Sequence, residues 1–211
     1  MSHTVAAHTI SELAELVSQI IHTRQTVLPR RLGDPGPSGE QLAAIVGAAA
    51  AAPDHQQLLP WRFVQVPASA RAALGQAFAL ALQQRDAAAT PEQLAQAREK
   101  AARAPLLLLA VVRLHDDKAD AEAIYSADVP PHERIVSAGC AIQNVLLMAH
   151  AMGFGAALTS GKALQSEPLR TLFGLSANEQ ALAFISMGTV VRTKPPRVRP
   201  ETAQFLTVLG Y

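Results

Sequence analysis

The chain of 211 residues carries 18 basic and 17 acidic side chains, and the resulting net charge of +1 excludes a general nucleic-acid or membrane-surface binder. Hydrophobic residues make up 49% of the sequence, enough for the core of a single domain, whereas aromatic residues make up only 4%, too few for stacking on many nucleobases. Cys140 is the only cysteine, which excludes an internal disulfide and a zinc–cysteine cluster.

The N-terminal quarter is predicted to hold two helices joined by an irregular connection. Residues 1–10 form a short arm, and Ser11 is placed to cap a helix whose apolar residues recur at helical spacing. Prolines and glycines make residues 27–37 irregular. Ser38 and Gln41 then match a capping box, which predicts the start of the second helix.

The middle of the chain is predicted to form two strands separated by two helices. Residues 62–66 alternate as a strand does, and residues 68–86 suit an alanine-rich helix. Residues 90–93 (TPEQ) open another helix with proline at its first position. The continuous apolar run at residues 105–113 indicates a buried central strand, and the charged residues 116–122 indicate a solvated loop.

The chain is organised around residues 137–161, which are apolar nearly all round up to His150. Such a helix is buried on every face, and it is predicted to start near His132 and to be stopped by Gly153 and Gly155. The elements predicted beyond it are a strand from Ala156 to Thr159, a helix from Glu167 to Phe173 closed by Gly174, a buried strand at residues 182–191 and a proline-rich basic tail.

The order of these elements mixes helices and strands without a regular βαβ alternation. This order predicts an α+β fold with three layers, in which helices flank a small central mixed sheet. The N-terminus lacks a basic region followed by an apolar run, and the longest uninterrupted apolar run is too short to span a bilayer. We therefore expect a cytoplasmic protein that binds neither membrane nor nucleic acid.

Several common catalytic motifs are missing from the sequence. It contains no GxGxxG after a strand, no P-loop, no HExxH and no GxSxG elbow, and its seven histidines are scattered, so no metal site is expected. The pieces that suit an anion are the triplet Arg24, Gln25 and Thr26 and the pair Arg197 and Arg199. From the residues alone, an ordinary solvated charge is the favoured interpretation of any single one of these arginines.

Four sequence blocks together carry a resemblance to a known family. They are the triplet followed by RRLGDPGPSGEQL, then AAPDHQQLLPWRF, then SAGCAIQNVLLMAHAMGFGAALTSG, and finally MGTVVRTKPPRVRP. In this order they resemble the FMN-dependent nitroreductase family, especially its small, compact bacterial members. The resemblance covers residues from about 12 to the end of the chain.

The resemblance implies an obligate homodimer with FMN in clefts at its interface. The expected domain covers residues 11–211, and the tail from about residue 192 would reach the other subunit. The implied cofactor-binding residues are Arg24, Gln25 and Thr26 at the phosphate and ribityl chain, His55 near FMN, Leu158, Thr159 and Ser160 at the flavin ring, and Arg197 and Arg199 at the phosphate. Gly155 would keep the approach to the ring open.

The activity implied by the resemblance is a ping-pong oxidoreductase cycle, in which NAD(P)H reduces FMN and a nitroaromatic, quinone or similar acceptor is then reduced. FMN carries the hydride chemistry, so no catalytic residue is assigned. Two alternatives stay open, because a fold does not fix a function. One is a different FMN reaction, such as flavin fragmentation or dehalogenation, with residues 68–103 as a lid. The other is a non-catalytic flavin-binding or structural dimer.

Overall fold

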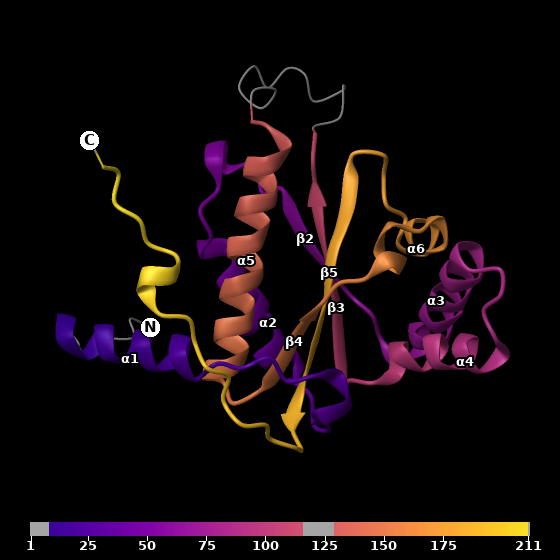
Figure 1. Cartoon of the computed structure of the whole chain (residues 1–211), viewed down its shortest axis with the longest axis horizontal. Helices are drawn as coiled ribbons and strands as arrows, with labels where there is room; N and C mark the ends of the chain where they lie inside the picture. The colour runs from indigo at the N-terminus through magenta and orange to yellow at the C-terminus, as the bar shows by residue number, and fades with distance from the viewer. Residues whose placement is uncertain (1–8, 116–128, 211) are drawn as a thin grey trace.

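The structure is a computed structural model of the whole chain, and it describes residues 9–115 and 129–210. The helices are α1 (Ile10–Thr23), α2 (Gly39–Gly47), α3 (Arg71–Arg85), α4 (Pro91–Glu99), α5 (Pro131–Ala151) and α6 (Glu167–Phe173). The strands are β1 (Leu32–Gly33), β2 (Trp61–Gln65), β3 (Leu106–Arg113), β4 (Gly155–Thr159) and β5 (Glu179–Val190). In Figure 1, α2 and α5 cover one face of the sheet while α3, α4 and α6 lie on the other. The predicted three-layer α+β fold is thus confirmed.

The sheet is built around β5, its longest strand. Its strand order is β1-β5-β3-β2, with β4 also paired to β5. Each of these strand pairs is antiparallel. The prediction of a mixed sheet was therefore wrong: among the described residues, the parallel pairing is limited to an isolated bridge between Thr26 and Ala156, outside the named strands.

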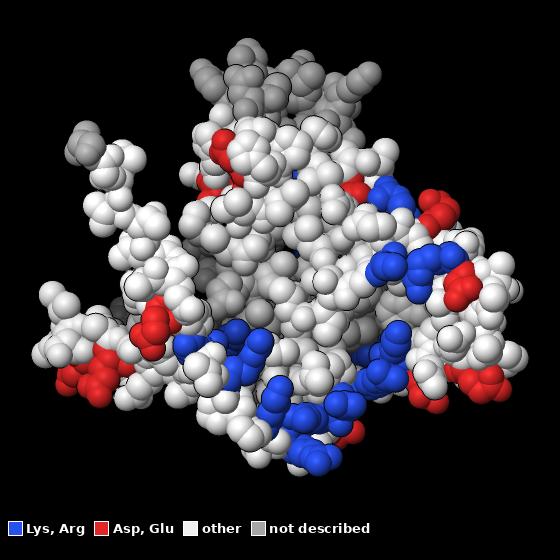
Figure 2. All heavy atoms as spheres, in the orientation of Figure 1, with Lys and Arg blue, Asp and Glu red and all other residues white. Residues whose placement is uncertain are grey.

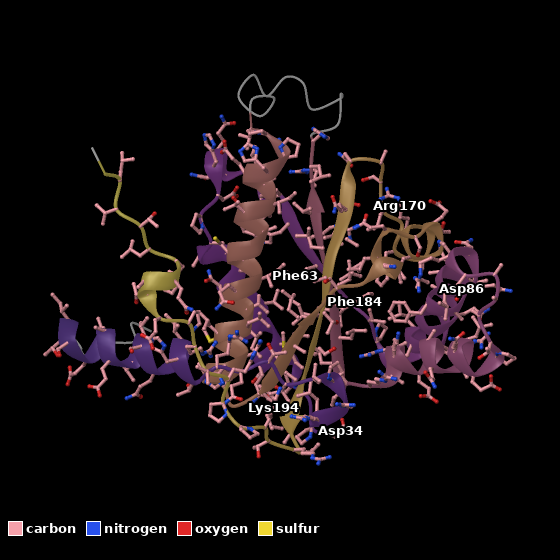
Figure 3. The ribbon with its side chains drawn as sticks, viewed as in Figure 1. Asp34, Phe63, Asp86, Arg170, Phe184 and Lys194 are labelled. Carbon is pink, nitrogen blue, oxygen red and sulfur yellow. The ribbon has the colours of Figure 1, made fainter. Side chains whose placement is uncertain are left out.

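The apolar strand β3 separates two hydrophobic cores. Because successive side chains of a strand point to opposite faces, Leu108 and Val112 pack with α5 while Leu107 and Leu109 pack with α3. Figure 3 shows the same division for Phe63 and Phe184, which belong to opposite cores. A continuous apolar run therefore predicted a strand buried on both faces correctly.

The predicted capping box at α2 is present, but α1 is capped by a different residue from the one expected. The Ser38 hydroxyl accepts from the Gln41 amide at 3.3 Å, and the Gln41 side chain accepts from the Ser38 amide at 2.9 Å. At α1 the cap is Thr9 rather than Ser11, because Glu12 stands three residues after Thr9 and completes a second capping box.

Two further predicted boundaries differ from the structure. The helix expected from residue 68 starts at Arg71, after a 3-10 turn over residues 68–70. Gly153, with φ of +84°, follows α5 as predicted, whereas Gly155 is not part of this stop and begins β4. A Cβ on Gly155 would lie 2.6 Å from Val190 Cγ2 and 2.8 Å from Leu32 Cδ2. This glycine therefore permits close packing between β4 and its neighbours.

α1 and the C-terminal tail are poorly covered by the rest of the chain. α1 has no buried residue, and residues 192–210 are exposed throughout. In Figure 1, α1 and the tail both lie at the left, on the side of α5 that faces away from the sheet. The predicted loop at residues 116–122 and most of the predicted arm, residues 1–8, lie outside the described residues. Within the described ranges, no helix combines the length and apolar character needed to cross a membrane.

Candidate functional site

A cavity of about 290 Å³ lies where α1, the end of α5 and the beginning of β4 meet. We call it the triplet cavity, because the predicted triplet Arg24, Gln25 and Thr26 forms one of its walls. Its other walls come from Leu146 and His150 of α5, from residues 153–156, from Val190 and from residues 192–194. Segments from both ends of the chain therefore meet at one site.

Local hydrogen bonds hold the triplet at this place. The Val27 amide donates to the Ala156 carbonyl at 2.9 Å, directly after the bridge between Thr26 and Ala156. One turn earlier, the Thr23 hydroxyl lies 2.8 Å from His150 Nε2. The triplet is thus aligned beside β4 at one end and fixed to α5 at the other.

The walls of the triplet cavity are cationic. Arg24, Arg31, Arg192 and Lys194 line it, and no acidic residue does so among the described residues. Figure 2 shows Lys and Arg side chains in a band across the lower part of this face, and Figure 3 labels Lys194 within that region. A cavity with cationic walls and no carboxylate is suited to an anion.

Burial and neighbouring positive charge both disfavour the protonated forms of Arg24 and His150 at the triplet cavity. Burial lowers the pKa of Arg24, and the charge of Arg199 lowers it further. Burial also lowers the pKa of His150, with a further contribution from Arg24. Within the described residues the Arg24 guanidinium makes no hydrogen bond, although its own carbonyl accepts one from Arg199 Nη2 at 2.8 Å. An anion would supply the missing partner.

The predicted phosphate residues are only partly gathered at this cavity. Arg197 and Arg199 are both exposed tail residues that do not line the cavity, although Arg199 donates a hydrogen bond to the Arg24 carbonyl. The predicted ring residues Leu158, Thr159 and Ser160 lie at the far end of β4. At roughly 3.3 Å per residue, Thr159 is about 13 Å along the strand from Gly155. A ligand contacting both groups would have to extend along β4.

His55 lies far from the triplet within one chain. Its Nδ1 is 2.7 Å from the Glu133 carboxylate, in the first turn of α5, whereas Thr23 contacts His150 in the last turn. Seventeen residues at roughly 1.5 Å each place Glu133 and His150 about 26 Å apart along the helix. His55 and Arg24 of the same chain therefore cannot contact one small ligand.

Sequence reasoning did not assign the four ionisable residues that line the triplet cavity beside Arg24. They are Arg31, His150, Arg192 and Lys194. Signals for them existed, since His150 is one of few polar side chains in an apolar helix, and the three cations lie in the first and fourth blocks. What the pattern lacked was the pairing of β4 with β5, which brings the end of β5 beside the triplet.

Comparisons with known proteins agree on one family. The model of the nitroreductase family matches residues 21–189. A protein of Escherichia coli strain K12 named "Putative NAD(P)H nitroreductase YdjA" is 33% identical over 161 residues, which are 75% of this chain and 81% of the relative.

Solved structures show the same fold at lower sequence identity. The nitroreductase-like family protein from Bacillus cereus has a TM-score of 0.74 and 16% identity, over 98% of this chain and 99% of its own. The NADPH:FMN oxidoreductase from Vibrio harveyi, solved with NAD+, has a TM-score of 0.68 and 19% identity, over 92% of this chain and 77% of its own. Since the family model covers most of the sequence, this chain belongs to the nitroreductase family.

Proposed function

We propose that this protein is an FMN-dependent oxidoreductase that takes hydride from NAD(P)H and reduces nitroaromatic, quinone or similar acceptors. The observation that carries the proposal is the triplet cavity, where Arg24, Arg31, Arg192 and Lys194 meet without an acidic residue among the described lining. The names of similar proteins add support, since one is called an NAD(P)H nitroreductase and another an NADPH:FMN oxidoreductase.

The donor set of the cavity fits the phosphate of FMN. Guanidinium groups offer several N–H donors to phosphate oxygens, and the Gln25 amide and Thr26 hydroxyl add neutral donors. In this proposal Arg24, Gln25 and Thr26 hold the phosphate and ribityl chain, and Arg199 and Arg197 of the tail add charge. Leu158, Thr159 and Ser160 lie against the ring. The flavin supplies the hydride chemistry, and the protein supplies binding and orientation.

The separation of His55 from Arg24 supports a dimeric site. If both residues contact FMN, we expect His55 to come from a second copy of the chain, because Glu133, which contacts His55, and His150, which contacts Thr23 beside Arg24, lie about 26 Å apart along α5 within one copy. A second copy would also cover large apolar side chains that one chain leaves exposed, which on α1 and the tail include Leu13, Val17, Phe205 and Leu206. We therefore propose a homodimer whose tail, residues 192–211, packs on the partner.

The triplet contains one arginine, a feature that would favour a non-catalytic dimer if Arg24 stood alone. Arg31, Arg192 and Lys194 supply additional positive charge at the same cavity, so the phosphate site is not short of cations. This observation favours a protein that binds FMN over a cofactor-free structural dimer.

The decisive experiment is a visible absorption spectrum of the purified protein with FMN, followed by NADPH or NADH under anaerobic conditions. We expect a bound-flavin spectrum that bleaches on addition of NAD(P)H and recovers with a quinone or nitroaromatic compound. A protein that takes up no FMN would contradict the proposal. Uptake of FMN without bleaching by either nucleotide would instead favour a flavin-binding role without this activity.

The shared site can be tested with mixed dimers. We expect Arg24→Gln and His55→Ala homodimers each to lose FMN affinity at both sites. A dimer carrying one chain of each variant would have one site with both changes and one intact site. Recovery of about one tight FMN site per mixed dimer supports sharing between subunits, and no recovery contradicts it.

A further inference from the structure

His150 is the only side chain in the described lining of the triplet cavity that titrates near neutral pH. β4 contributes no charged residue to this lining. The charged groups around the ring are cations, namely Arg24, Arg31, Arg192 and Lys194 in the lining and Arg199, which donates to the Arg24 carbonyl. Arginine and lysine keep their charge well above neutral pH, whereas an unperturbed imidazole titrates at about 6.5. A proton gained or lost in this lining between pH 5 and 8 therefore belongs to His150.

Two hydrogen bonds set the tautomer of the His150 ring. The Thr23 hydroxyl donates its only proton to the Gln19 carbonyl at 2.6 Å, a contact that threonine often makes with the preceding helical turn. The same hydroxyl oxygen lies 2.8 Å from His150 Nε2. Because its proton is already donated to Gln19, the hydroxyl can only accept from His150, so Nε2 carries a hydrogen.

The other ring nitrogen, Nδ1, is therefore the atom that titrates. In the neutral ring Nδ1 holds a lone pair, and it makes no hydrogen bond within the described residues. A proton added to the ring goes to Nδ1, and Nε2–H still donates to Thr23 in the charged ring. The contact with Thr23 thus persists in both protonation states, and protonation adds a positive charge to the cavity wall.

The cations around His150 disfavour that added charge. Burial lowers the pKa of His150, and the positive charge of Arg24 lowers it further. An anion in contact with Arg24 would introduce attraction beside this repulsion, because an opposite charge within about 4–6 Å favours the ionised form of a group. The anion and the proton on His150 would then each strengthen the binding of the other.

We propose that the triplet cavity binds an anion together with a proton that His150 takes up from solvent, and that Thr23 is the positioning residue that fixes the ring. This inference deepens the proposed function and rests on it where the anion is the phosphate of FMN. Anion affinity should rise as the pH falls through the pKa of His150 in the anion-bound protein. It should level off below the pKa of His150 in the free protein.

The test follows the His150 ring by NMR in the full-length chain, with sulfate as the probe. Sulfate keeps the same charge between pH 5 and 8, whereas a phosphate monoester changes its own charge near pH 6. After removal of any flavin, the ring is titrated in sodium sulfate and in sodium chloride of equal ionic strength, which controls for general screening. We expect a higher pKa of His150 in sulfate than in chloride. Identical titration curves in the two salts would overturn the proposal.

Substitution of His150 tests whether it carries the proton. Calorimetry should show sulfate binding to the wild-type chain roughly fivefold more tightly at pH 5.5 than at pH 8, the factor for unit charges about 4 Å apart in water. In His150→Gln this preference for low pH should disappear. His22→Gln is the matched control and should keep it, since His22 lies in the last turn of α1 but does not line the cavity. A wild-type preference in His150→Gln would refute the proposal.

Thr23→Val tests the positioning role of Thr23. Valine keeps the shape of the side chain but removes the oxygen that accepts from Nε2–H. The nitrogen-15 chemical shifts of the neutral ring should therefore show a smaller share of the Nε2–H tautomer than in the wild-type chain. An unchanged tautomer in this variant would refute the role of Thr23.

Failure of this inference and failure of the proposed function give different results. Sulfate binding that does not depend on pH, together with normal FMN uptake, would refute only the uptake of a proton by His150. Sulfate binding that favours low pH, in a protein that takes up no FMN, would support the inference and refute only the flavin proposal.

Discussion

Replacing Arg24 with glutamine is the sharpest single test of the triplet cavity. Glutamine keeps a polar side chain but removes the charge that would face a phosphate. A hydrogen bond to a charged group is worth roughly 1.5–3 kcal/mol, and about 1.4 kcal/mol corresponds to a factor of ten, so FMN should bind roughly 10- to 100-fold more weakly. Fluorescence quenching of FMN during titration with protein gives the dissociation constant directly.

The same substitution should not reduce the stability of the FMN-free protein. Burial and the charge of Arg199 already act against the ionised Arg24, as its lowered pKa indicates. Removing this charge relieves that repulsion, so urea unfolding without FMN should show a loss of no more than about 0.5 kcal/mol, the range of ordinary surface changes. Arg98→Gln, remote from the triplet cavity, is the control for FMN affinity. Affinity of the Arg24 variant within twofold of wild type would refute the assignment of the phosphate site.

Three further outcomes follow from the structure. Gly155→Ala should lower the free energy of unfolding by about 1–3 kcal/mol in urea, because its Cβ would lie 2.6 Å from a neighbouring side chain, whereas Gly47→Ala, helical and open on all sides, should raise it by up to about 1 kcal/mol. NMR titration should give His150 a pKa below 6.5 that rises in Arg24→Gln. Since folding lowers this pKa, the contribution of His150 to stability is present above pH 6.5 and is lost as the pH falls through the folded value. Phe205→Asp, in the exposed tail, should weaken the proposed dimer in sedimentation velocity, and an unchanged oligomeric state would contradict that role for the tail.

Local chemistry allowed most of the fold to be predicted. The capping box predicted at Ser38 requires only residues three positions apart, and it is present in the structure. The helix predicted to open at residues 90–93, with proline at its first position, is present as α4. The apolar run of β3 likewise predicted a buried central strand, and the structure buries it on both faces. Thr9 was missed as the cap of α1 because Ser11 is an equally good capping residue, and the choice depended on the position of Glu12.

The candidate site was less predictable, because its geometry depends on contacts between distant segments. The sequence pointed to Arg24, but the cations that surround it come from the ends of other elements, and only the folded sheet brings Arg192 and Lys194 to the same cavity. Gly155 was identified from the sequence, but its packing role was not predicted. Its lack of a side chain was assigned to ligand access, whereas the structure gives it close contacts with Val190 and Leu32.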